Sequence, residues 1–199
     1  MHKAATVLAV GFLLLLMLPA AQAGTVAISM ASYTDFTNGS WTLGFEFEPT
    51  TDIFVTSLGS FFPSDADDVH GVTLWNTSAT ALATTTVTGT GTAGFDYTAI
   101  TPVELFAGQM YVIGANTLSD DYAIDPTFTT AAAIDYLGHV ETMCSGVTPC
   151  FPGTSLEASS DFGANFTFTT ATPEPASAAL VGTLLALLAF HRFRRKLPA

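Results

Sequence analysis

The sequence predicts an all-β fold: a single jelly-roll-like β-sandwich between an apolar N-terminal segment and a C-terminal apolar helix. Residues 41–48 and 162–169 alternate between apolar and small or polar side chains, the period of a strand with one buried face. Turn residues separate several short runs of β-forming residues between them. This middle part shows no convincing helical period.

The first alternating stretch places Trp41, Leu43, Phe45 and Phe47 on one face, so we expect all four in the core. Further strands are expected in six runs, at residues 53–62, 71–75, 82–88, 95–100, 110–115 and 134–137. The run 110–115 is apolar on both faces, which is typical of a central strand.

The N-terminus has the three parts of a secretory signal peptide. A basic start at Lys3 precedes an apolar run over residues 4–18, and small residues at Ala21 and Ala23 precede Gly24. The pattern predicts a signal peptide over residues 1–23, cleaved between Ala23 and Gly24. A retained membrane helix is the alternative.

The C-terminus, residues 172–199, has a different three-part order. In the motif Pro173-Glu174-Pro175 the two prolines resist helix and sheet, and the uncharged run over about 176–190 is predicted to be a transmembrane helix. Its length of about 22 Å falls short of the roughly 30 Å hydrocarbon core. The tail 191–199 carries basic residues that can snorkel and that mark the cytoplasmic side, namely Arg192, Arg194, Arg195 and Lys196.

This layout resembles the PEP-CTERM sorting signal of bacteria with two membranes. The resemblance implies recognition and processing by an exosortase, a membrane-embedded cysteine transpeptidase-like enzyme. The Leu-Pro-x-Thr-Gly motif of cell-wall sorting signals is absent, and a lipid-anchor signal would end in its apolar tail. An ordinary single membrane anchor is the alternative.

The predicted extracytoplasmic domain, residues 24–171, has an unusual charge composition. All five Lys and Arg residues of the chain lie outside it, whereas it holds every one of the 17 acidic residues except Glu174. His70 and His139 are its basic side chains. Such a domain repels nucleic acid and anionic headgroups, so we expect no nucleic-acid partner.

The two cysteines, Cys144 and Cys150, lie six residues apart. After export to an oxidising compartment they are expected to form a disulfide that closes one short loop. A metal site is the alternative, but the chain has no further cysteine and no Cys-x-x-Cys spacing.

A second resemblance extends over most of residues 44–168. Segments 44–47, 53–61, 70–76, 99–105, 107–115 and 162–166 occur in the order seen in an uncharacterised β-sandwich module of secreted bacterial proteins. Some relatives carry the same sorting tail, and others attach the module to carbohydrate-processing proteins. The resemblance implies a fold and a location, without catalytic residues.

The residues do not favour an enzyme. Nucleophilic catalysis would need Ser or Cys near a His and an acid, and a Gly-x-Ser-x-Gly elbow is absent. His139 lacks the second His of a zinc helix. Carbohydrate binding is the main alternative, because aromatic side chains can form a sugar platform. The candidates are Trp41, Trp75, Tyr97, Tyr111, Tyr122 and Tyr136.

Two acidic groups suggest a Ca²⁺ site, since Ca²⁺ prefers several oxygen ligands. Asp65, Asp67 and Asp68 form the first group, in a predicted loop, and the second consists of Asp120, Asp121 and Asp125. Neither has the full Ca²⁺-loop pattern, and solvated acidic turns are the alternative.

Together these features predict an exported, exosortase-sorted, non-catalytic protein. It would be held transiently in the inner membrane and then reach the cell surface or an extracellular matrix, associated with exopolysaccharide or biofilm. A carbohydrate-binding module is the alternative, and a polysaccharide-active enzyme is less favoured.

Overall fold

The computed structural model describes residues 24–62, 68–118, 122–155 and 161–170. These residues are all-β, with no α-helix among them, and their sheets have a sandwich-like arrangement, so the predicted fold class is confirmed at this level. No helix in this described part could span a membrane. The predicted signal peptide and sorting segment lie outside it.

The described strands form three antiparallel sheets. The first has the order β1 (Thr25–Val26), β13 (Ala164–Thr170), β4 (Ile53–Phe62) and β7 (Gly94–Leu105). The second has the order β11 (Thr154–Ser155), β10 (Ile134–Met143), β3 (Trp41–Pro49), β8 (Tyr111–Asn116), β5 (Val69–Asn76) and β6 (Ala81–Thr88). The third has the order β12 (Asp161–Phe162), β9 (Tyr122–Thr130) and β2 (Ile28–Phe36).

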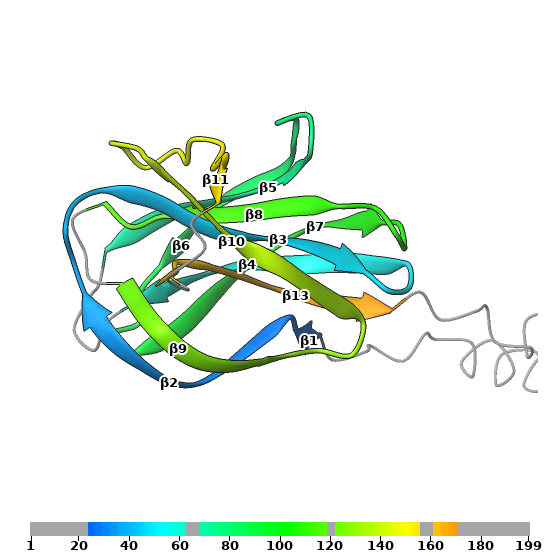
Figure 1. The fold of residues 1–199 in the computed structure, drawn as a ribbon, viewed down its shortest axis with the longest axis horizontal. Helices are drawn as coiled ribbons and strands as arrows, with labels where there is room; N and C mark the ends of the chain where they lie inside the picture. Colours follow the sequence, from blue (N-terminus) through cyan, green and yellow to red (C-terminus); the bar gives the residue numbers. More distant parts are fainter. Residues whose placement is uncertain (1–23, 63–67, 119–121, 156–160, 171–199) are drawn as a thin grey trace, which may run out of the picture. The chain divides into compact units, whose positions relative to one another are not determined.

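The four-stranded and six-stranded sheets pack face to face, and β2 and β9 curve along one side of this sandwich (Figure 1). All three sheets contribute to one hydrophobic core, as Ile28, Phe47 and Phe166 show. The Phe47 and Phe166 rings lie 4.8 Å apart and join the two large sheets. Burying one such side chain contributes about 1.5–3 kcal/mol.

The strand predictions are confirmed best where one or both faces are buried. Phe45 and Phe47 lie in the core as the alternation predicted. Residues 111–115 of the apolar run lie in β8, which is buried at every residue and lies in the interior of the six-stranded sheet, whereas Met110 precedes the strand and is exposed. Strands β7 and β10 extend well beyond the predicted runs at 95–100 and 134–137.

Strands β2 and β9 were not predicted. Most of β2 is exposed, so it lacks a strong apolar pattern. Strand β9 contains Pro126, which normally argues against a strand interior. The β2–β9 register is irregular between Ser32 and Thr34 and passes over Asp125 and Pro126, so the proline lies in a bulge and removes no ladder hydrogen bond.

Cys144 and Cys150 form the expected disulfide. Their loop lies on the outer face of the six-stranded sheet, where small residues leave room for it. A Cβ atom built on Gly71 would lie 1.8 Å from the carbonyl oxygen of Val147. Phe151 packs edge-on against Trp75, which is 5% exposed. The loop therefore covers a tryptophan that the strand pattern alone turns toward solvent.

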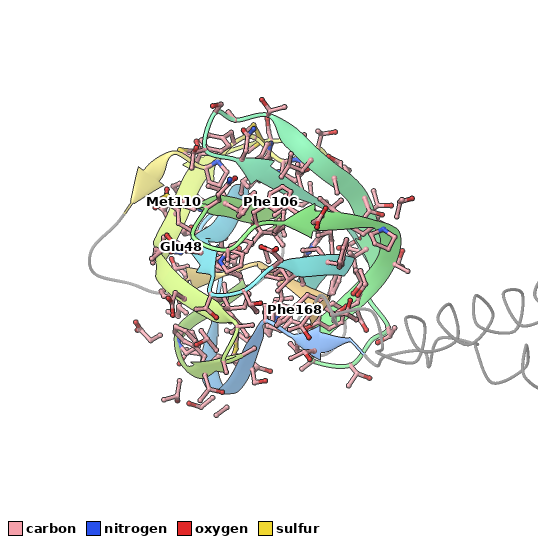
Figure 2. The ribbon with its side chains drawn as sticks, turned by 90° about the vertical axis from the view of Figure 1, so that its right-hand side faces the viewer. Glu48, Phe106, Met110 and Phe168 are labelled. Atoms are coloured by element: carbon pink, nitrogen blue, oxygen red, sulfur yellow. A yellow bond between two sulfur atoms is a disulfide. The ribbon has the colours of Figure 1, made fainter. Side chains whose placement is uncertain are left out.

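The turn between β7 and β8 lies at the end of the sandwich seen in Figure 2, where Phe106 and Met110 are labelled. Both side chains are exposed. Two side chains help to hold the turn, because Ala107 N–H donates to Asp52 Oδ1 and Phe106 N–H donates to the Tyr111 hydroxyl oxygen.

We predict that Gly44→Ala destabilises the domain. A Cβ at Gly44 would lie 1.8 Å from the Ile113 carbonyl oxygen, so β3 and β8 would have to separate. The expected loss is about 1–3 kcal/mol in urea unfolding. Gly138→Ala is the matched control, since a Cβ there meets no atom within 4 Å. Equal midpoints for the two variants would contradict the β3–β8 register.

Replacing Cys144 and Cys150 together by Ser should lower the unfolding free energy by about 2 kcal/mol, as expected for a short closed loop. The loop should also lift from Trp75 and shift its fluorescence to longer wavelength. Trp41→Phe isolates this signal, because the chain has two tryptophans. Unchanged Trp75 emission would show that the loop stays on the sheet without its disulfide.

Candidate functional site: an acidic, aromatic pocket

A pocket of about 360 Å³ lies where the three-stranded sheet meets the β3–β10 side of the six-stranded sheet. Strand β2 ends at Phe36, and β3 begins five residues later at Trp41, so the short connection between the two sheets borders the pocket. The lining residues come from distant parts of the chain, namely Phe36, Asn38, Trp41, Tyr122, Ile124, Asp125, Glu141 and Asp161.

Asn38 organises the aromatic part of the pocket. Its side-chain oxygen accepts hydrogen bonds from Trp41 Nε1 at 2.6 Å and from the Tyr122 hydroxyl at 2.9 Å. Because an indole N–H can only donate, this contact identifies the amide oxygen. The Phe36 ring lies edge-on to Tyr122, with centroids 5.9 Å apart. Three aromatic side chains thus line the pocket around one amide.

The acidic part centres on His139, which is 4% exposed. The backbone N–H of Asp161 donates to His139 Nδ1 at 3.3 Å, and His139 Nε2 lies 3.3 Å from Glu141 Oε2. Since Nδ1 accepts a hydrogen bond, the neutral ring carries its proton on Nε2 and donates it to Glu141. His139 and Glu141 are two residues apart on β10 and lie on the same face of the strand.

Asp125 reaches the pocket from the β9 bulge. Its φ of 48° lies in the left-handed region, which Asp and Asn tolerate better than most residues. Pro126 follows it and has a restricted φ of its own. Both residue types therefore suit the backbone of the bulge. Three carboxylates, of Asp125, Glu141 and Asp161, therefore line one pocket together with the aromatic rings.

Among the described residues, His139, Glu141 and Asp161 have ligand atoms within 4.8 Å of one another, a spacing that could hold a metal ion. A metal-bound histidine usually donates its second ring N–H to an acceptor. Here Nδ1 faces the N–H of Asp161 instead. The hydrogen bonding thus favours a role of His139 as a hydrogen-bond donor to Glu141 rather than as a metal ligand.

The pKa of Tyr122 is raised to about 12, first by burial and then by the negative charges of Asp161 and Glu141. At neutral pH its phenol is therefore a firm hydrogen-bond donor to Asn38 and can still accept a hydrogen bond from a ligand.

The family model for the domain of unknown function DUF4082 matches residues 29–167 of this chain. The chain belongs to the DUF4082 family. No curated protein matches it. The matched region of this DUF4082 protein includes every residue that lines the pocket.

The aromatic candidates predicted from the sequence are distributed unevenly over the DUF4082 domain. Trp41 and Tyr122 line the pocket. The expectation that Trp41 belongs to the core is wrong, because its side chain is half-buried and lies outside the core cluster, at the start of β3 where the sandwich ends.

The remaining aromatic candidates do not contribute to this pocket. Trp75 and Tyr111 are each 5% exposed, which leaves them no platform for a sugar. The Tyr97 hydroxyl accepts a hydrogen bond from Asn165 Nδ2. Tyr136 borders a second, more open hollow of about 780 Å³ along the β9–β10 connection, where Asp135 is the single carboxylate.

The first predicted Ca²⁺ group remains a prediction. Asp65 and Asp67 lie outside the described residues. Asp68 is exposed just before β5, and its carbonyl oxygen accepts the Gly89 N–H. Of the second group, Asp120 and Asp121 also lie outside the described part, and Asp125 lines the pocket.

His70 forms a hydrogen bond with Ser60 in the interior. Ser60 Oγ lies 2.9 Å from His70 Nδ1, and the imidazole stacks on Phe62 with centroids 4.4 Å apart. Their exposures of 0% and 1% leave no access for a substrate. This pair therefore has a packing role.

Sequence reasoning missed Phe36, Asn38 and Asp161 as site residues. None of them forms a motif with its sequence neighbours. The spacing His139-x-Glu141 within a run of β-forming residues could have indicated a shared strand face, but β10 was expected to end at residue 137.

The high pKa of Tyr122 predicts a stability that falls at alkaline pH. An unfolded tyrosine ionises near pH 10 and the folded Tyr122 near pH 12, so unfolding releases a proton between these values and stability decreases as pH rises through them. Tyr122→Phe should show a smaller decrease, measured by urea unfolding at each pH.

Glu141→Gln should lower the pKa of Tyr122, since it removes one of the charges that raise it. Ultraviolet absorbance of the phenolate, with Tyr122→Phe subtracted, measures this pKa. Glu104→Gln is the control, because Glu104 is exposed on β7 and its replacement also removes one negative charge. An equal shift in both variants would mean that Glu141 has no special proximity to the phenol.

Proposed function

We propose that this DUF4082 protein is an exported, exosortase-sorted, non-catalytic component of the cell surface or of an extracellular polysaccharide matrix. The observation that carries the proposal is the order of targeting segments around one domain: a signal peptide over residues 1–23 and the Pro173–Pro175 motif, apolar run and basic tail at the other end. The disulfide supports export, because such bonds persist in oxidising compartments.

In this proposal the C-terminal run 176–190 holds the chain transiently in the inner membrane, and the exosortase then processes the segment near Pro173–Pro175. The domain between the targeting segments is proposed to be a jelly-roll-like sandwich. Two facing antiparallel sheets with neighbours distant in sequence, such as β3 between β8 and β10, support this finer description.

Carbohydrate binding is the second candidate, and the pocket is the observation that favours it. Sugars bind through apolar ring faces that contact aromatic side chains and through hydroxyls that pair with amide and carboxylate groups. Trp41, Asn38 and Glu141 offer such groups within one pocket. A matrix protein with this pocket would contact exopolysaccharide directly.

The intact mass of the mature protein tests the sorting proposal. In a bacterium that has an exosortase, the purified product should begin at Gly24 and end near residues 173–175. Replacing Pro173, Glu174 and Pro175 together by Ala should yield a product that keeps its basic tail. A mature unmutated protein that still ends at Ala199 would overturn the proposal.

The non-catalytic part of the proposal has its own test. Incubation with polysaccharides should release no reducing ends above the level of a Glu141→Gln variant. Turnover that this single change abolishes would assign the protein to the polysaccharide-active enzymes.

A further inference from the structure

The pocket has a strongly one-sided charge. Asp125, Glu141 and Asp161 contribute carboxylates, and residues 24–172 contain no Lys or Arg that could neutralise them. His139 donates to one oxygen of Glu141. The electrostatic potential in the pocket is therefore negative, which repels uronates, phosphates and sulfates and attracts a cation.

The aromatic lining narrows the kind of cation. A hydrated metal ion gains nothing from rings and needs several oxygen ligands, and the His139 ring is oriented as a hydrogen-bond donor. An organic ammonium group, in contrast, gains from carboxylates through charge-assisted hydrogen bonds and from the more exposed rings of Phe36 and Trp41 through cation–π attraction. A quaternary ammonium has no N–H to donate to the carboxylates, so a protonated primary amine fits better.

The size and the remaining polar groups favour a sugar as the carrier of that amine. A volume of about 360 Å³ is at the lower end of small-molecule sites. The Asn38 amide and the Tyr122 hydroxyl are placed beside the carboxylates and can pair with hydroxyl groups. Trp41, half-buried at the pocket, offers apolar area for a sugar ring.

We propose that the pocket binds an amino sugar with a free, protonated amine, as found in a de-N-acetylated glycan, with Glu141 and Asp161 pairing with the ammonium and Trp41 contacting the ring. This inference rests on the carbohydrate-binding function proposed above and names its ligand class. Asp125, at the exposed β9 bulge, adds attraction at the entrance.

Isothermal titration of the full chain in mild detergent tests the inference with three matched tetrasaccharides: glucosamine, N-acetylglucosamine and a uronate. The glucosamine tetramer should bind. The N-acetylated tetramer should bind at least about tenfold more weakly, and the uronate tetramer should not bind. Raising the salt concentration should weaken the glucosamine interaction.

Three variants locate the site. Glu141→Gln should weaken glucosamine binding by about tenfold or more and weaken N-acetylglucosamine binding much less, because Gln keeps a hydrogen-bonding group and loses only the charge. Asp125→Asn should weaken glucosamine binding less than Glu141→Gln does. This change suits the fold because Asn tolerates the left-handed conformation at this position. Glu104→Gln changes the net charge equally, far from the pocket lining, and should have no effect. Thermal midpoints establish that each variant is folded.

The outcomes separate the two proposals. If the N-acetylglucosamine and glucosamine tetramers bind equally, and Glu141→Gln changes neither affinity, the ammonium specificity is overturned. Carbohydrate binding by the pocket would still stand. No binding of any tetramer would overturn carbohydrate binding itself. Equal losses in Glu141→Gln and Glu104→Gln would reduce the effect to general charge attraction, and loss of binding in a chelator would assign it to a metal ion. Both results would overturn the inference.

Discussion

The contact between Phe47 on β3 and Phe166 on β13 is the interaction on which the rest of the structure depends. It joins the six-stranded sheet to the four-stranded sheet at a centroid distance of 4.8 Å, and Phe45 stacks on the same Phe166 ring. Because β3 also pairs with β10, its position fixes His139 and Glu141. The Phe47 contact therefore sets the spacing between the core and the acidic side of the pocket.

The domain links buried polar groups across its sheets without Lys or Arg. Asn165 donates to the Ile28 carbonyl oxygen and accepts the Ile28 N–H, which ties β2 to the centre of the four-stranded sheet. His139 performs a similar task between β10 and the backbone of Asp161. Amide and imidazole groups thus make the links that Lys and Arg pairs make elsewhere.

How far the sequence predicts this fold depends on burial. The alternation at residues 41–48 and the doubly apolar run at 110–115 identify β3 and β8, because each of these strands is packed on a sheet face. Strands β2 and β9 escape prediction because β2 is largely exposed and β9 contains Pro126 at a bulge. Local pattern reflects burial, and these two strands are stabilised mainly by pairing with each other.

The pocket was less predictable than the fold for a different reason. Tyr122 and Trp41 were recognisable as aromatic candidates, but their partners Phe36 and Asp161 come from opposite ends of the domain and meet through strand pairing alone. Trp75 shows the opposite case, since Phe151, which directly follows the disulfide-closed loop, covers it. Neither the approach of distant strands nor the covering of a face is encoded in a short stretch of residues.

The register of β2 gives the domain two distinct poles. Val26, just before β2, pairs with Thr167, so both ends of the domain lie at one pole, whereas Phe36 pairs with Tyr122 beside the pocket at the other (Figure 1). The eight residue steps along β2 separate these poles by roughly 26 Å. A ligand in the pocket would therefore lie about the length of β2 away from both ends of the domain.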